Sequence, residues 1–224
     1  MTDIDAIALR ARDGDVRALR ALLRSLQQRI YDVAVRMLWY PDEAREATNA
    51  ILLHVLKQLN SFGGEVPVTS WAWHVAASHL LTARKSRREL DQLTFGKLAV
   101  QIESSLGEEP VLLDETQRLL SEEIHIGCTH AMLLCLDREY RLAYILGEIC
   151  DISGKEGAYI FDITPDAFRQ RLSRARAAIR TFKNDNCGVA NPSNPCRCSR
   201  RIEDALRTGW ADVDNLLFAR GIDP

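Results

Sequence analysis

Four arginines and one glutamine lie between residues 169 and 176, where the sequence is RQRLSRAR. The apolar residues in this region are spaced by four, three and four, at Phe168, Leu172, Ala175 and Ile179. This period predicts the buried face of a helix. The polar side chains outside that face are Arg169, Gln170, Ser173, Arg174 and Arg176. Because guanidinium groups bind phosphates and guanine edges through paired hydrogen bonds, the pattern favours nucleic-acid recognition over the alternative, a solvated surface helix.

A shorter predicted helix precedes this arginine-bearing helix, and together they read as a helix-turn-helix. Ser153 and Glu156 have the spacing of a capping box, which opens the first helix. Thr164 and Pro165 open the second, because a proline in the first helical turn loses no hydrogen bond. The second helix of such a motif lies in a DNA groove.

The positive charge of the chain is concentrated in the same region. The whole chain has a net charge of −2, whereas residues 165–201 contain nine Arg and Lys against two Asp, a local net of +7. A basic segment in a nearly neutral chain is typical of a protein that binds DNA together with a partner protein. Phosphate contacts of this kind predict an affinity that falls steeply with salt.

A second set of side chains that could do chemistry consists of three thiols near the C-terminus. Cys187, Cys196 and Cys198 lie in a turn-rich segment that could fold around a soft cation such as zinc. Arginines at positions 197, 200 and 201 predict lowered thiol pKa values, which would also suit redox sensing.

These three thiols have no fourth ligand beside them in the sequence. His125 or His130 could supply it only if the tail folds back, and a packed or disordered tail with incidental thiols is the alternative. The remaining cysteines, Cys128, Cys135 and Cys150, lie on or near apolar helix faces and are predicted to be core residues.

No pattern in the sequence indicates catalysis. His54, His74 and His79 lie on predicted helices without a second ligand four residues on, and without a paired nucleophile and carboxylate. We therefore expect that the chain is not an enzyme and that it requires no cofactor.

Composition predicts a folded protein of one large or two small domains. The 224 residues are 46% hydrophobic, and no apolar run approaches the roughly 18 residues of a membrane span. The N-terminal stretch MTDIDAIALR lacks the layout of a signal peptide, so we expect the cytoplasm and no membrane insertion. Cysteines in that compartment are thiols or metal ligands rather than disulfides.

Helical periodicity dominates the chain and predicts an all-α fold. One helix is expected from residue 16 to about residue 39, and Pro41 opens the next. After a turn-rich loop at residues 62–67, Ser70 is expected to cap a helix carrying Trp71 and Trp73, at least one of which should be core. The basic residues at the end of that helix are Arg84, Lys85, Arg87 and Arg88. Residues 1–90 are the first expected domain.

The pattern weakens over residues 91–121, which contain six acids and the helix breakers Gly96, Gly107 and Pro110. We expect an acidic linker there. Periodicity returns over residues 122–184, the second expected domain, which ends with the helix-turn-helix. Residues 185–224 form a cysteine-rich C-terminal extension.

Several stretches resemble a known family. RIYDVAVRML, PDEAREATNAILLHVLKQLNSF and SWAWHVAASHLLTARKSRR are similar to region 2 of the extracytoplasmic-function (ECF) class of bacterial sigma factors. LDREYRLAYILGEICDISGKEGAYIFDITPDAFRQRLSRARAAI is similar to region 4 of the same class. The interval from Phe62 to Trp71 matches the spacing of the family's F…W loop. Two motifs in the family's order are more specific than either alone.

The resemblance implies a dissociable subunit that binds core RNA polymerase and directs promoter recognition and transcription initiation. Its docking sites would be the β′ clamp helices and the β flap, and Arg45, Glu46 and Asn49 would contact the clamp helices. The acidic linker resembles the family's connector through the polymerase cleft. An anti-sigma protein is a further expected partner, and the tail thiols are candidates for control by metal or redox state.

The resemblance also implies the promoter contacts. The minus-10 element, with its flipped base, would meet Gly63, Gly64, Glu65, Ser70, Trp71, Ser78, Arg84, Lys85, Arg87 and Arg88. The minus-35 element would meet Arg169, Gln170, Ser173 and Arg174, while Arg171 and Arg176 would hold the DNA backbone. Unstacking a base costs a few kcal/mol, which stacking or hydrogen bonds in such a loop must offset.

The sequence departs from the family pattern at several positions. The docking helix lacks two of the usual acids, Ser78 replaces a common asparagine, and Asp137 replaces a common proline. Gly157 stands where isoleucine is typical, at a helix cost of about 1 kcal/mol relative to alanine. Two other functions therefore stay open: a sigma-like decoy that sequesters an anti-sigma protein, and a stand-alone metal-responsive helix-turn-helix regulator.

Overall fold

The computed structural model describes residues 3–219, and this part of the chain is all-α, with no strand. Its contacts divide it into two units. Unit 1 consists of residues 3–90 and 138–173, and unit 2 of residues 91–137 and 174–219. Among these residues, no helix combines the length and apolar character that crossing a bilayer requires.

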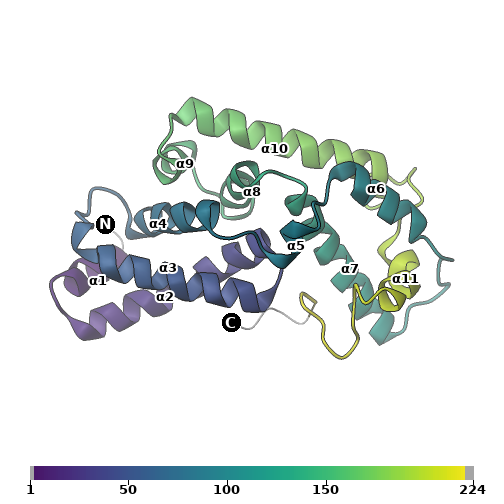
Figure 1. The fold of residues 1–224 in the computed structure, drawn as a ribbon, viewed down its shortest axis with the longest axis horizontal. Helices are drawn as coiled ribbons and strands as arrows, with labels where there is room; N and C mark the ends of the chain where they lie inside the picture. The colour runs from purple at the N-terminus through teal and green to yellow at the C-terminus, as the bar shows by residue number, and fades with distance from the viewer. Residues whose placement is uncertain (1–2, 220–224) are drawn as a thin grey trace. The chain divides into compact units, whose positions relative to one another are not determined.

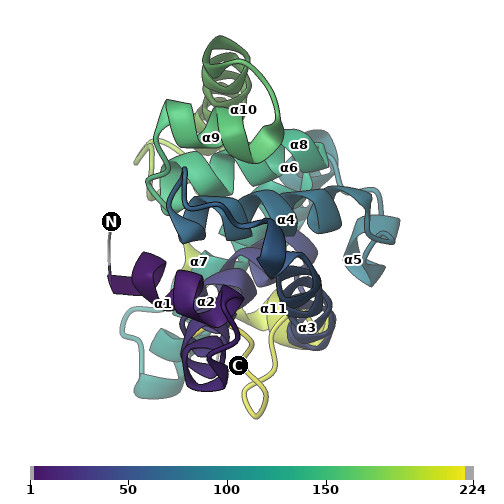
Figure 2. The ribbon, with the colours of Figure 1, turned by 90° about the vertical axis from the view of Figure 1, so that its left-hand side faces the viewer.

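The first part of unit 1 is a helical bundle (Figures 1 and 2). Its elements are α1 (Asp3–Arg12), α2 (Val16–Leu38), α3 (Pro41–Gln58), the 3-10 turn η1 (Leu59–Ser61), α4 (Val68–Thr82) and the short α5 (Arg87–Leu90). The expected starts of α2 and α3 are confirmed. Asp15 caps α2 through its side chain, and Pro41 occupies the first turn of α3. The bundle core includes Leu22, Ile30 and Ile51, which are fully buried.

The start of α4 differs from the prediction that Ser70 caps this helix. The helix begins at Val68, whose N–H donates to Oδ1 of Asp5 in α1 at 2.8 Å. Ser70 is buried in the first turn, and its hydroxyl donates to Oε1 of Glu156 at 3.0 Å. The cap therefore comes from a residue far away in the sequence, and local spacing could not reveal it.

The second part of unit 1 contains the predicted helix-turn-helix. It consists of α8 (Arg138–Tyr144), the π-helical turn η2 (Ile145–Ile149), α9 (Gly154–Phe161) and the first residues of α10 (Pro165–Asn186). The capping box is confirmed, because Ser153 Oγ accepts from the Glu156 N–H and Glu156 Oε2 accepts from the Ser153 N–H. Thr164 Oγ1 accepts from the Ala167 N–H at 3.2 Å, as its place before Pro165 predicts.

The contact between α9 and α10 depends on Gly157. A Cβ atom at this position would lie 2.4 Å from ring atoms of Phe168, which is 1% exposed. We expect Gly157→Ala to destabilise the protein by about 1–3 kcal/mol in urea unfolding, because overpacking must displace the ring. At Gly154 on the same helix, a Cβ would meet Arg169 Cγ at 3.6 Å, an ordinary contact. The control Gly154→Ala should therefore be harmless, and equal stability of the two variants would contradict this account.

Unit 2 is built around the long helix α7. Its elements are α6 (Phe95–Ser104), α7 (Glu115–Leu134), the second half of α10, η3 (Cys198–Arg201) and α11 (Ile202–Arg207). Its core cluster is Leu120, Ile124, Ile202, Ala205 and Ala211. The C-terminal extension therefore packs on α7.

Two local details of this region differ from the sequence pattern. The stretch expected as a linker contains α6, with Gly96 inside the helix, and α7 begins at Glu115 rather than Glu122. Asp114 and Gln117 form a capping box at the start of α7. Thr94 caps α6 by accepting from the Lys97 N–H. The expected domains 1–90, 91–121, 122–184 and 185–224 stay a prediction, whereas the contacts group residues 138–173 with 3–90.

Glu123 on α7 anchors the end of the described chain. This carboxylate is 2% exposed and accepts three backbone hydrogen bonds, from the N–H groups of Leu217, Phe218 and Ala219 at 2.8–2.9 Å. Hydrogen bonds to a charged group contribute about 1.5–3 kcal/mol. We expect Glu123→Gln to lower the free energy of unfolding by that amount and to speed proteolysis around residues 217–219. The exposed neighbour offers the control Glu122→Gln, which should change neither; equal effects would contradict the anchoring role.

Candidate nucleic-acid interface

The arginine-bearing face of α10 is solvent-exposed. Arg169, Gln170, Ser173, Arg174 and Arg176 are all exposed. The apolar stripe is buried as predicted, at Phe168, Leu172, Ala175 and Ile179. Three guanidinium groups and an amide on the accessible surface of one helix can reach phosphates or base edges.

Arg169 and Arg171 of this helix pair with carboxylates. Arg169 forms an ion pair with Asp166 one turn earlier, and both side chains are exposed. Arg171 is half-buried, pairs with Glu139 at 2.7 Å, and lies over the ring of Phe161 at 5.1 Å. Because an exposed ion pair contributes little, Arg169 can exchange its partner for a phosphate. Arg171 instead helps to hold α10 against α8 and α9.

The loop before α4 is exposed to solvent, whereas Ser70 and Trp71, which were also expected to contact the minus-10 element, are buried. Gly63, Gly64 and Glu65 are exposed, and Gly64 adopts a φ of +87°, which favours glycine. Ser70 and Trp71 are buried, and Trp71 packs on Phe62 with ring centroids 5.5 Å apart. The tryptophan therefore serves as core in this structure. Trp73 is buried as well, which confirms that at least one of the two is core.

Helix α9 covers part of α4 within unit 1. In addition to the hydrogen bond between Ser70 and Glu156, His74 Nδ1 lies 3.2 Å from the carbonyl oxygen of Ile160. The rings of His74 and Tyr159 are 5.5 Å apart. The face of α4 that carries Ser70 is thus occupied by the first helix of the helix-turn-helix. Ser78, further along α4, is exposed.

The residues of the basic cluster after α4 differ in their contacts. Arg84 and Lys85 are exposed. Arg87 binds Asp42 at 2.8 Å and Glu43 at 3.1 Å, and lies over the ring of Tyr40. The guanidinium of Arg88 lies 4.9 Å from the centre of the Trp39 ring.

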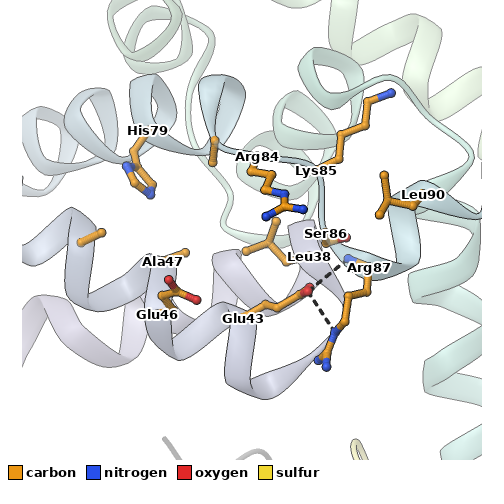
Figure 3. Close-up of a pocket in the computed structure, with 12 residues that line it drawn as sticks. Leu38, Glu43, Glu46, Ala47, His79, Arg84, Lys85, Ser86, Arg87 and Leu90 are labelled. Carbon is orange, nitrogen blue, oxygen red and sulfur yellow. Dashed lines mark hydrogen bonds and ion pairs between the residues drawn. The ribbon is translucent and has the colours of Figure 1, made fainter.

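A pocket of about 490 Å³ brings the basic cluster together with α3 (Figure 3). Arg84 and Lys85 lie on one side and Glu43 and Glu46 of α3 on the other. His79 also lines the pocket, and burial and the neighbouring His54 ring lower its pKa. Positive charge in the pocket at neutral pH therefore comes from the arginines and the lysine.

The candidate docking residues share an exposed face of α3. Arg45, Glu46 and Asn49 are exposed, whereas Ala44 and Ala47 are buried. Glu46 also lines the pocket beside the basic cluster. The structure therefore brings one candidate docking residue next to candidate DNA-contacting residues, which the sequence did not predict.

Sequence reasoning missed a buried ion-pair network that fixes the end of α4. Glu89 binds Arg138 at 2.6 Å and Arg141 at 2.9 Å. Arg138 also donates to the carbonyl oxygens of Leu80, Ala83 and Arg84. Arg138 and Arg141 are three residues apart on a helix, and this spacing predicts that they share a face. The sequence does not indicate that Glu89 is their common partner.

The carboxyl of Glu89 is held ionised by this network. Burial alone would raise its pKa, but hydrogen bonds from Arg138 and the Ser86 N–H, with the charges of Arg141 and Arg138, lower the pKa to about 2. Arg141 also donates to the carbonyl oxygen of Met37 at 2.6 Å. The network thus ties α2, α5 and α8 together and presents Arg84 and Lys85 from a fixed backbone.

The pKa values of two tail thiols shift in the direction opposite to the prediction. Neighbouring arginines were expected to lower their pKa values, but burial outweighs the guanidinium charges. The pKa of Cys196 is raised, and that of Cys198 is raised to about 12. Across residues 3–219, no three His, Cys, Asp or Glu side chains already stand in the geometry of a metal site. Cys128, Cys135 and Cys150 are half-buried rather than fully buried.

No protein-family model matches this chain, and no curated protein matches it.

Proposed function

We propose that this chain is an ECF-type sigma factor that binds core RNA polymerase and directs promoter recognition and transcription initiation. The observation that carries the proposal is the exposed polar face of α10, which carries Arg169, Gln170 and Arg174. It follows a capped helix and a short turn, as in a helix-turn-helix. A second basic surface at Arg84 and Lys85 provides a separate DNA contact.

The proposal gives each surface one role. The α10 face contacts the minus-35 element, with Arg176 on the DNA backbone. The exposed loop residues Gly63, Gly64 and Glu65, with Ser78, contact the minus-10 element, and Arg84 and Lys85 neutralise its phosphates. Arg45, Glu46 and Asn49 dock on the polymerase. No reaction is assigned to the chain itself.

In this structure α9 covers the part of α4 that carries Ser70. Ser70 is covered by Glu156, so a flipped base can reach Ser70 only after α9 leaves α4. Polymerase or DNA contacts would have to replace the hydrogen bond between Ser70 and Glu156 and the contacts of His74 with Ile160 and Tyr159. A DNA-bound form would then differ from this one in the position of α9.

Footprinting with and without polymerase separates the proposal from its rivals. Transcript starts mapped after overexpression of the chain would supply the promoter fragment. We expect protection of both promoter elements only when core polymerase and the chain are present together. Protection by the chain alone would identify a stand-alone regulator, and failure to bind core polymerase would leave the decoy function.

A further inference from the structure

Four of the six cysteines lie on segments of unit 2 that contact one another. They come from three segments: Cys128 from α7, Cys187 from the residue after α10, and Cys196 and Cys198 from the tail. The Gly188 N–H donates to the carbonyl oxygen of Cys196 at 3.1 Å, so the backbones at 187–188 and 196 are in contact.

The tail thiols are also held against α7. Cys198 Sγ lies 3.7 Å from Nδ1 of His125. His125 and Cys128 are spaced by three on this helix, so they share the face on which η3 packs. Because η3 begins at Cys198 and packs on α7, and the backbone at Cys196 contacts residue 188, the segments that carry all four thiols are in contact.

A buried cation accompanies these thiols. Arg201 is 7% exposed, donates to Ser105 Oγ at 2.7 Å, and lies over the ring of Trp210. Its charge acts on Cys128, Cys196 and Cys198. A buried guanidinium is stabilised by nearby negative charge, and a thiolate cluster would supply that charge.

We propose that Cys128, Cys187, Cys196 and Cys198 form a tetrahedral site for a soft divalent cation such as Zn²⁺. Four thiolates suit such a cation, and Arg201 offsets part of their excess negative charge. In residues 3–219 the thiols do not stand in coordination geometry, so binding requires these side chains to turn toward one another. Each thiol that binds loses its proton to solvent.

His125 would orient one of the four ligands without binding the cation itself. Its ring hydrogen-bonds to Cys198 and so orients that thiolate, as outer partners of metal ligands commonly do. The bound cation would join α7, the end of α10 and the tail. This site does not depend on a role in transcription, so it stands or falls separately from the proposed function.

Metal analysis of the full-length chain tests the site. The protein is reduced, stripped with a chelator, and titrated with Co²⁺ and then with Zn²⁺. We expect one equivalent to bind, with the thiolate-to-cobalt charge-transfer absorption and the ligand-field bands of tetrahedral Co²⁺, which Zn²⁺ then abolishes. Absence of binding, or a spectrum without thiolate bands, would overturn the proposal.

Variants identify the ligands. Cys128→Ser should weaken Co²⁺ binding by at least tenfold, in line with loss of a ligand, whereas Cys135→Ser on the same stretch of chain should leave binding unchanged. His125→Ala should retain the full set of thiolate bands. Retained tetrathiolate bands in Cys128→Ser, or their loss in His125→Ala, would refute the four-thiol assignment.

Alkylation of the wild-type protein keeps the test decisive if a serine variant does not fold. With Zn²⁺ bound, peptide mapping should show the four proposed thiols protected and Cys135 and Cys150 modified at the same rate as without metal. A chelator should release all four together. Equal modification rates of the four thiols with and without Zn²⁺ would contradict the site.

Discussion

Replacement of Glu89 by glutamine is expected to destabilise unit 1 by about 3–5 kcal/mol. Its carboxylate is the shared partner of Arg138 and Arg141, whose side chains are 15% and 4% exposed. Removing one member of a buried ion pair leaves uncompensated charge, an effect of that size. Urea unfolding followed by circular dichroism measures it.

Glu43→Gln is the matched control for this substitution. Glu43 also pairs with an arginine, Arg87, but that guanidinium side chain is 59% exposed. An exposed ion pair contributes less than about 1 kcal/mol, so the control should remain close to the parent protein. Equal losses in the two variants would show that burial of the network does not determine its strength.

The same network predicts an acid dependence of stability. The folded-state pKa of Glu89, about 2, lies below its ordinary value of 4.5. The stability it contributes is therefore fully present above pH 4.5 and is lost as the pH falls toward 2. At about 1.4 kcal/mol per pH unit this contribution is roughly 3 kcal/mol. Glu89→Gln should flatten the stability profile in that window, and an unchanged slope would contradict the assignment.

Loss of the α10 arginines is the second substitution from which we expect a large effect. In Arg169→Ala/Arg174→Ala, promoter affinity of the polymerase complex should fall by at least tenfold, because each base or phosphate contact contributes about 1–3 kcal/mol. Both side chains are exposed, so the stability of the free protein should hardly change. Fluorescence anisotropy with labelled promoter DNA measures the affinity.

A control with the same loss of charge separates contact from net charge. Arg20→Ala/Arg24→Ala removes two exposed arginines from α2. Promoter affinity should remain within about twofold of the parent protein if α10 makes the contact, since general electrostatic attraction alone changes little with the loss of two exposed charges. An equal loss in both double variants would argue against specific recognition by α10.

Local signals in the sequence predicted much of this fold. Pro41, the capping box at Ser153 and Glu156, and the Thr164–Pro165 pair each act within one helical turn, and each marks a helix start in the structure. The apolar stripe of α10 is also local, so its buried face could be read from spacing.

The features that the sequence did not reveal depend on residues far apart in the chain. Asp5 caps α4 across 63 residues, and Glu89 meets Arg138 across 49. Cys128 was expected to be core because it lies on an apolar stripe, yet the tail packs on the same helix and places Cys198 Sγ 3.7 Å from His125, three residues before Cys128. Such pairings follow from tertiary packing, which periodicity cannot specify.

Run-off transcription with purified bacterial core polymerase tests the central proposal most directly. The template carries a promoter identified by mapping transcript starts after overexpression, and the chain is the only specificity subunit added. We predict a single transcript from the mapped start, lost in Arg169→Ala/Arg174→Ala and kept in Arg20→Ala/Arg24→Ala. No promoter-specific transcript, together with no binding to core polymerase, would contradict the assignment as a sigma factor.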